Sequence, residues 1–369
     1  MTQVSIVIAT RDRHAELLRT LGAIGALPVG RDAEVIVVDN ASAERVRAGA
    51  RLANGVRVRT LRLDENAGAA GRNAGAEAAE AEWLLMLDDD SAPTDAGFLA
   101  AADGAGEGVG AVGGRIDLTD GTRERGGLPE VIVGCGALVR RGDFLDAGGY
   151  DASFGYYAEE YDLCARLLLS GLSVSYDQRL RVVHRKVNVG RDMGAILRRI
   201  TRNSAWVELR YAPERLRDEM VEHVVGRYGA IAEKEGATAG FERGVEELAA
   251  TYEAQPRREM DAALYDRFTG LAHARASVFG ARERLAGRRV AMVGAGKQAW
   301  AVERALAELS VVGAGCELVG SPGLAEVLVV GTLSPGPMFD ALAAHAGRGK
   351  PVVAPWSPGL PALDKATAA

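Results

Sequence analysis

Short apolar runs alternate with helix-like segments along the first half of the chain. The runs VSIVIAT (residues 4–10), EVIVVD (34–39) and WLLMLD (83–88) are apolar almost throughout, which is typical of buried strands. Between the first two runs, apolar residues recur at the spacing of a helix: Leu17, Leu18, Leu21 and Ile24. Strand and helix patterns in turn predict βαβ units and a parallel sheet.

The same alternation continues to about residue 185. VRVRTLRL (56–63) alternates polar and apolar residues, as a half-exposed strand does, and VIVGCGALVRR (131–141) has strand character. AEEYDLCARLLLSG predicts a helix that ends near Gly171. VSYD (174–177) and LRVVHR (180–185) then predict two short strands.

The pattern changes near residue 190, where charged helical segments begin. After about residue 285 the α/β alternation returns with shorter elements, beginning with RRVAMVGAG, a strand that runs into a glycine turn. We therefore predict four parts: an α/β domain over 1–190, a helical segment over 191–286, a small Rossmann-like α/β module over 287–360, and a tail over 361–369.

Composition narrows the function classes only slightly. The 369 residues are 48% hydrophobic and 25% charged, with a net charge of −6 that argues against a nucleic-acid partner. The cysteines, Cys135, Cys164 and Cys316, lie far apart without metal-ligand spacing and fit a reducing compartment. The chain enters directly on an apolar strand pattern and shows no membrane-span pattern, so we expect a cytoplasmic protein without a signal peptide. Arginine outnumbers lysine, and Ala and Gly are abundant, as in proteins from GC-rich bacterial genomes.

Polar residues follow the predicted strands at their carboxyl ends, where ligands bind in parallel sheets. These are residues 10–13, Asp39 with Asn40, and the run Asp88 to Asp90. Three adjacent carboxylates repel one another and resist burial. The run either ends a strand in solvent or shares a divalent cation such as Mg²⁺ or Mn²⁺, which prefers oxygen ligands.

Three further groups have both a structural and a functional interpretation. Glu159 and Glu160 open a predicted helix, where acids favour the helix dipole, but either could serve as a general base. His184 follows a strand and is either a structural residue or a metal ligand. In NAGAAGRNAGA, small residues either pack a helix start or let the backbone approach a ligand beside Arg72.

The order of these segments resembles the family 2 glycosyltransferases, inverting enzymes of the GT-A fold, and most closely their rhamnosyltransferase-like branch. The matching segments are VSIVIATRDR, EVIVVDNAS, NAGAAGRNAGA, WLLMLDDD, GCGALVRRGDFLDAGGYDASFGYYAEEYDLCARLLLSGLSV and VVH, within residues 3–186. The resemblance implies a GT-A-type Rossmann-like mixed sheet flanked by helices, followed by the helical segment and the small module.

The resemblance also implies roles at the donor side of a site. Thr10, Arg11 and Arg13 would line a nucleotide pocket, Asp39 would read the edge of the base, and Arg72 would lie near the nucleotide or its diphosphate. The donor would be a UDP-, dTDP- or GDP-linked sugar.

A DxD motif and an acidic base complete the implied site. Asp90 would lie most directly on a Mg²⁺ or Mn²⁺ ion, with Asp88 second, and Asp88 or Asp89 near the ribose. His184 would complete the metal site. Glu160 stands where relatives carry an Asp and would be the base, with Glu159 as the alternative.

The implied reaction is metal-dependent transfer of a sugar to an acceptor hydroxyl with inversion. The cation would offset charge on the leaving diphosphate, and the base would take the proton of the attacking hydroxyl. Acceptors left open are a cell-envelope glycan, a lipid-linked intermediate and a small molecule. A nucleotide-sugar-binding scaffold without turnover is the alternative from another class.

RRITRNSAWVELRYAP resembles a segment that follows the catalytic domain in these relatives. Arg202 and Asn203 therefore belong either to the acceptor side or to a charged helix face with Trp206 and Leu209 packed inward.

The small module carries a dinucleotide-binding fingerprint. Gly294, Gly296 and Ala299 satisfy G-x-G-x-x-G/A between a strand and a helix, and Glu317 lies near the position of an acidic ribose partner. An NAD(P)-linked oxidoreductase is therefore a further alternative. Because the module is only half a dinucleotide fold, we favour a role in packing, acceptor shaping or a homodimer.

Overall fold

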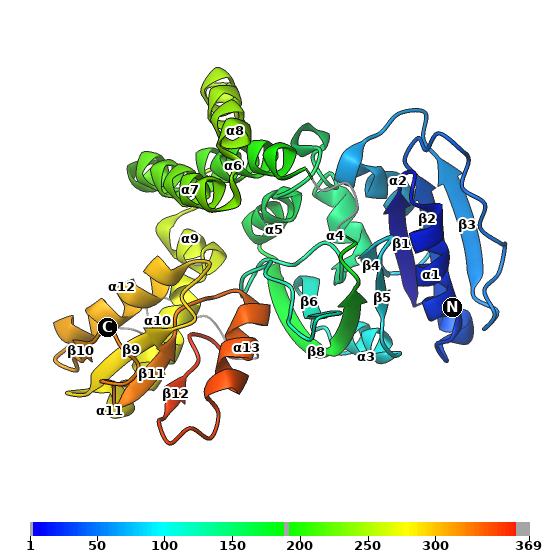
Figure 1. The fold of residues 1–369 in the computed structure, drawn as a ribbon. Coiled ribbons are helices and arrows are strands. Elements are labelled where there is room, and N and C mark those ends of the chain that lie inside the picture. The colour runs from blue at the N-terminus through cyan, green and yellow to red at the C-terminus, as the bar shows by residue number, and fades with distance from the viewer. Residues whose placement is uncertain (1–2, 188–191, 359–369) are drawn as a thin grey trace.

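The computed structural model describes residues 3–187 and 192–358 and contains two sheets with a group of helices between them (Figure 1). The predicted tail over 361–369 lies outside these residues. The strands are β1 (Val4–Thr10), β2 (Ala33–Asp39), β3 (Arg57–Arg62), β4 (Trp83–Asp88), β5 (Ser91–Pro93), β6 (Val109–Leu118), β7 (Ala137–Arg140), β8 (Ser173–His184), β9 (Arg289–Val293), β10 (Glu317–Leu318), β11 (Val327–Val330) and β12 (Val352–Val353).

Helices occur in both described ranges. They are α1 (His14–Gly25), α2 (Gly71–Ala78), α3 (Gly97–Asp103), α4 (Arg141–Asp146), α5 (Glu159–Leu169), α6 (Met193–Tyr211), α7 (Glu214–Glu235), α8 (Thr238–Thr251), α9 (Ala262–Phe268), α10 (Leu271–Gly280), α11 (Arg282–Leu285), α12 (Ala299–Val311) and α13 (Pro335–His345). The four-part division of the chain stays a prediction.

The large sheet has the strand order β3-β2-β1-β4-β7-β6-β8-β5 and is mixed, as expected. Its first four strands are parallel, whereas β7 is antiparallel to both of its neighbours. Thr10 pairs with Asp39, and Ala9 pairs with Asp88. The carboxyl ends of β1, β2 and β4 therefore meet at one edge of the sheet.

Helices cover both faces of this sheet. Alternate residues of β1 and β2 point to opposite sides, because side chains alternate along a strand. Ile6 and Val35 pack in a cluster with residues of α1 and α3. Val7 and Ile36 pack in the other cluster, which contains residues of α2, α4 and α5. Burial on both faces explains why these strands are apolar almost throughout.

Two strand predictions were wrong in detail. The two short strands predicted after α5 are one strand, β8, whose pairing with β6 shifts between Gly114 and Arg115. Asp177 accepts a hydrogen bond from the backbone N–H of Arg179 there, so the polar interruption is a bulge and not a strand end. In 131–141, only Ala137–Arg140 forms a strand, because residues 128–136 turn twice.

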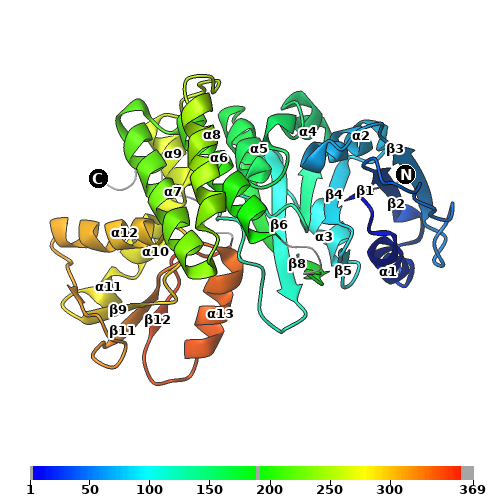
Figure 2. The same cartoon turned by 45° about the horizontal axis from the view of Figure 1, so that its top comes forward.

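The small sheet is parallel, with the order β10-β9-β11-β12, and α13 lies between it and β6 of the large sheet (Figure 2). Asp340 of α13 forms an ion pair with Arg123, and Tyr176 of β8 contacts the rings of Phe339 and Trp356. The small module is thus joined to the large sheet by polar and aromatic contacts. A homodimer through it stays a prediction. Within the described ranges, no helix is both long and apolar enough to cross a membrane.

Candidate active site

The acidic run lies where β4 turns into β5, and each carboxylate has different partners. Asp89 accepts a hydrogen bond from Thr10 at 2.8 Å and lies 3.3 Å from a guanidinium nitrogen of Arg13. Asp90 lies 2.6 Å from Arg13, and Asp88 forms an ion pair with Arg72. Burial raises the pKa of Asp89 to about 6, and the charges of its two neighbours act in the same direction.

His184 reaches this run through strand pairing. Ser91 of β5 is opposite His184 of β8, so two segments far apart in the sequence become neighbours. The Nε2 atom of His184 lies 3.3 Å from Asp90, and its Nδ1 atom lies 2.9 Å from Glu124. Burial by itself lowers the pKa of His184, but hydrogen bonds to Asp90, Cys135 and Glu124 outweigh it and raise the pKa to about 12.

One set of side chains here could hold a metal ion. The carboxylate of Asp88, the thiol of Cys135 and the imidazole of His184 offer ligand atoms within 4.8 Å of one another. Burial raises the pKa of Cys135 to about 11, so its sulfur is a neutral thiol near pH 7. Sequence reasoning missed Cys135 and Glu124, because they come from segments of irregular structure that carry no spacing signal.

Glu159 and Glu160 open α5 on the other side of the same region. Glu160 accepts a hydrogen bond from the backbone N–H of Gly134 at 3.1 Å, while the Oε2 atom of buried Glu159 has no hydrogen-bond partner. Burial raises the pKa of both carboxyls. The charge of Glu160 raises the pKa of Glu159 further, and the charge of Asp88 raises the pKa of both. Such groups are suited to accept a proton near neutral pH.

Asp162, one turn further along α5, has a structural role. It is almost fully buried and accepts hydrogen bonds from Arg166, Arg210 and the hydroxyl of Tyr211. Because Arg210 and Tyr211 belong to α6, this paired carboxylate fixes α5 against α6.

The loop before α5 is held in an unfavourable backbone conformation by Asn203. Tyr157 and Ala158 have φ angles of 74° and 67°, which L-residues rarely adopt. The Asn203 side-chain amide lies within 2.7–2.9 Å of the carbonyl oxygens of Phe154, Tyr156 and Tyr157. Asn203 therefore supports the loop that leads into Glu159 and Glu160.

We predict that Asn203→Ala lowers the free energy of unfolding by about 1–3 kcal/mol, because buried carbonyls lose their donor. It should also lower any turnover that depends on Glu159 or Glu160. Thr201→Val, on the same helix, is the matched control, since the Thr201 hydroxyl is buried without a hydrogen-bond partner. Urea denaturation and initial rates measure both effects. Wild-type stability and rate in Asn203→Ala would show that the loop does not depend on this amide.

Two hollows meet at Asp88. The first hollow, of about 1450 Å³ including its open part, is lined by six predicted residues: Thr10, Arg11, Arg13, Arg72, Asp88 and Asp89. The second hollow, of about 1180 Å³, is lined by five: Arg72, Asp88, Glu159, Glu160 and His184. The structure thus brings together predicted residues from β1, α2, β4, α5 and β8.

Two predicted residues line neither hollow. Asp39 is 1% exposed, and its carboxylate accepts hydrogen bonds from Arg62 and from the backbone of Ser42 and Val46. Asp90 lies behind the hollows, between Arg13 and His184.

Arg202 lines the first hollow, as Asp88 and Arg13 do, and does not line the second. Its guanidinium is over the ring of Trp206, which is buried together with Leu209, as the packing interpretation of this helix predicts.

Comparisons with known proteins give one family match. Residues 5–154 match the model of the family described as Glycosyl transferase family 2. A comparison with curated proteins gave no match. The match covers the strands that end at Thr10, Asp39 and Asp88, but not Glu159, Glu160 or His184.

Several solved structures are similar at low identity. A mannosyltransferase from Pyrobaculum calidifontis in complex with GDP-Man and Mn²⁺ is 16% identical, with a TM-score of 0.45 over 68% of this chain and 75% of that chain. S. aureus TarS 1–349 in complex with UDP-GlcNAc is 16% identical, with a TM-score of 0.49 over 76% and 87%. GalNAc-T7 with UDP, GalNAc and Mn²⁺ is 17% identical, with a TM-score of 0.49 over 69% and 58%.

The sheet and the family match agree on the class of enzyme. The match includes the parallel half of the large sheet and the acidic run at its edge, while the rhamnosyltransferase-like branch stays a prediction. Residues 5–154 are therefore similar to a glycosyltransferase family 2 domain, and the chain is a glycosyltransferase.

Proposed function

We propose that the chain transfers a sugar from a nucleotide-diphosphate sugar to an acceptor hydroxyl, with a divalent cation and with inversion at the anomeric carbon. One observation carries this proposal. Asp88 and Arg72 line both hollows, so a group placed between them would face the metal-capable residues and the buried acids at once.

The first hollow suits the donor. Arg11, Arg13 and Arg72 supply guanidinium groups for a diphosphate, and the hydroxyl of Thr10 is held by Asp89. For Asp39 to recognise the nucleobase, its carboxylate must give up hydrogen bonds that it now accepts from Arg62 and the loop backbone. The experiment below decides whether the nucleotide contains uridine, thymidine or guanosine.

The residues around His184 fit Mn²⁺ or Mg²⁺. Carboxylate oxygen and imidazole nitrogen are ligands that Mn²⁺ accepts, and we assign the ion to Asp88, Asp90 and His184. Glu124 would receive the Nδ1–H of His184 and so turn Nε2 toward the ion, as second-layer carboxylates commonly do. When bound, the ion supplies positive charge to the leaving diphosphate.

The second hollow suits the acceptor and the base. Glu160 is fixed by the Gly134 N–H and would take the proton of the acceptor hydroxyl as that oxygen attacks the anomeric carbon. If the donor occupies the first hollow and the acceptor the second, the two substrates meet at Asp88, which supports in-line attack and hence inversion.

A thermal-melt screen of UDP-, dTDP- and GDP-sugars, each with and without Mn²⁺, tests the proposal. We expect one nucleotide class to raise the melting temperature only when Mn²⁺ is present; at 100 times Kd, binding stabilises by about 2.7 kcal/mol. If no nucleotide-sugar stabilises the protein in a metal-dependent way, the proposed function is wrong.

A further inference from the structure

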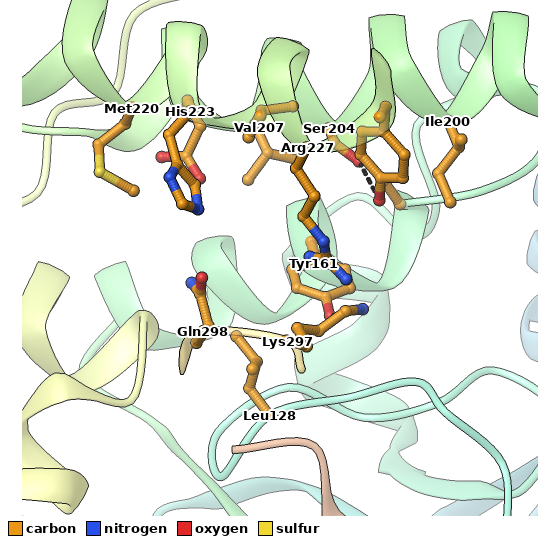
Figure 3. Close-up of a pocket in the computed structure, with 14 residues that line it drawn as sticks. Leu128, Tyr161, Ile200, Ser204, Val207, Met220, His223, Arg227, Lys297 and Gln298 are labelled. Atoms are coloured by element: carbon orange, nitrogen blue, oxygen red, sulfur yellow. Dashed lines mark hydrogen bonds between the residues drawn. The ribbon is translucent and has the colours of Figure 1, made fainter. Parts of the chain in front are cut away.

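A third hollow lies between α5, α6, α7 and the glycine turn of the small module (Figure 3). It encloses about 630 Å³ of empty space, part of it open to solvent. Its walls combine apolar, aromatic and cationic side chains, and Figure 3 shows Arg227 reaching from α7 toward Tyr161 and Lys297. The lining residues used below are Tyr161, Ile200, Glu208, His223, Arg227 and Lys297.

The third hollow contains two cations without acidic partners. Among the described residues, no ion pair joins Lys297 or Arg227 to a carboxylate; Lys297 donates instead to the hydroxyl of Tyr161 at 2.6 Å. The carboxyl in the lining, Glu208, is bonded to the hydroxyl of Tyr265, and burial raises its pKa to about 7. The walls therefore favour a negatively charged ligand.

The titration of the neighbouring groups agrees with this positive field. Burial first, and then the charge of Arg227, lowers the pKa of Lys297 to about 8 and also lowers that of His223. Glu160 and Glu124 oppose this effect at Lys297, and Glu219 opposes it at His223. An anion between Lys297 and Arg227 would relieve their repulsion.

The glycine turn delivers Lys297 to this position. The turn follows β9, and its Gly296 N–H bonds to the carbonyl of Gly331, which follows the adjacent strand β11. The strand order reverses between β9 and β11, and such switch points are where open α/β sheets bind ligands. Here the crevice faces the glycosyltransferase domain.

The second and third hollows are neighbours with a shared wall. Tyr161, Ile200 and Lys297 line both, and the second hollow also holds Glu159 and Glu160. Lys297 is therefore within reach of a ligand in the second hollow, beside Glu160, and also faces the third hollow with Arg227.

From this arrangement we infer that the third hollow binds an anionic group of the acceptor, a carboxylate or a phosphate, while its hydroxyl lies at Glu160. This inference rests on the proposed function, because it identifies the class of acceptor for that reaction. It assigns the recognition of the acceptor to two specificity-determining residues, Lys297 of the small module and Arg227 of α7.

Melting of the full-length protein in the presence of glucose 6-phosphate, glucuronate or glucose tests the inference. These three probes share a ring and differ in carrying a phosphate, a carboxylate or no charge. The titration is run with and without Mn²⁺ and the nucleotide found by the screen above. We expect at least one anionic sugar to stabilise the protein and glucose to have no effect. Which anionic sugar acts identifies the anion.

Variants then locate the binding. Lys297→Met and Arg227→Met should each weaken binding of the anionic sugar by about tenfold or more, since charged hydrogen bonds are lost. Arg215→Met, an exposed position on the same helix outside the hollow, should bind it like the wild type. Equal response to all three probes, or unchanged binding in both variants, would overturn the inference. If nucleotide-sugar binding persists in that case, only the inference is wrong and the proposed function is not contradicted.

Discussion

Replacing Glu160 with Gln is expected to lower the rate of sugar transfer by about 10²–10⁴-fold, the usual contribution of a general base. The amide oxygen of Gln can still accept the Gly134 N–H, so the loop and the helix start should keep their structure. Donor binding should also be unchanged, because Glu160 lines the second hollow and not the first. Initial rates and nucleotide-dependent melting measure the two properties separately.

Two companion variants sharpen this result. Glu159→Gln should lose less activity, because the charge of Arg72, on the donor side, acts on Glu159, whereas that of Lys297 acts on Glu160. Glu160→Asp keeps a carboxylate that is one methylene shorter and should retain part of the rate. A greater loss in Glu159→Gln would transfer the role of base to Glu159. Full activity in both Gln variants would rule out an acidic base here.

The pH dependence follows from the same burial. Because burial raises the pKa of Glu160 and Glu159, both remain protonated at pH values where exposed glutamates are ionised. A base must be deprotonated, so kcat should fall as the pH falls through the raised pKa and should level off above it. The Glu160→Gln variant should lose this ascending limb.

The large sheet was predictable because its strands are buried on both faces. The runs ending at Thr10, Asp39 and Asp88 are apolar almost throughout, and parallel pairing then brings their polar ends together. The bulge in β8 was not predictable in this way, since Asp177 and Arg179 resemble a turn in sequence and are accommodated only by pairing with β6.

The residues missed by sequence reasoning depend on contacts between distant segments. Glu124 and Cys135 reach His184 only because β6 pairs with β8, with Leu118 opposite His184, and the β6–β7 connection folds back over it. Lys297 lies within the dinucleotide-binding fingerprint of the glycine turn. Its side chain faces the acids of α5 because the small module packs against β6 and β8. A local sequence pattern cannot predict that packing.

The acidic run shows why adjacent carboxylates can be retained at low exposure. Asp89 is held by Thr10 and Arg13, Asp90 by Arg13 and His184, and Asp88 by Arg72, so each of the three charges has a partner inside the protein. Asp88 is the most exposed of the three, with its side chain 22% accessible, and lines both hollows. Asp89 and Asp90 are thus buried with their partners, while Asp88 lies at the edge where an incoming ligand would meet it.

Asp88→Asn is accordingly expected to remove Mn²⁺-dependent stabilisation by nucleotide-sugar and to lower the transfer rate by about 100-fold or more. Loss of a cation that stabilises the leaving diphosphate costs several kcal/mol in the transition state. Asp90→Asn should have a comparable effect, because Asp90 faces the Nε2 atom of His184. Melting with and without Mn²⁺, together with initial rates, measures both variants.

Cys135→Ala tests whether the sulfur of this cluster contributes to metal binding beside its oxygen and nitrogen ligands. A buried neutral thiol is a poor ligand for Mn²⁺ or Mg²⁺, so this variant should keep metal-dependent nucleotide binding. Loss of that binding in Cys135→Ala, with its retention in Asp88→Asn and Asp90→Asn, would contradict the assignment. It would instead indicate a softer metal such as Zn²⁺ held through Cys135 and His184.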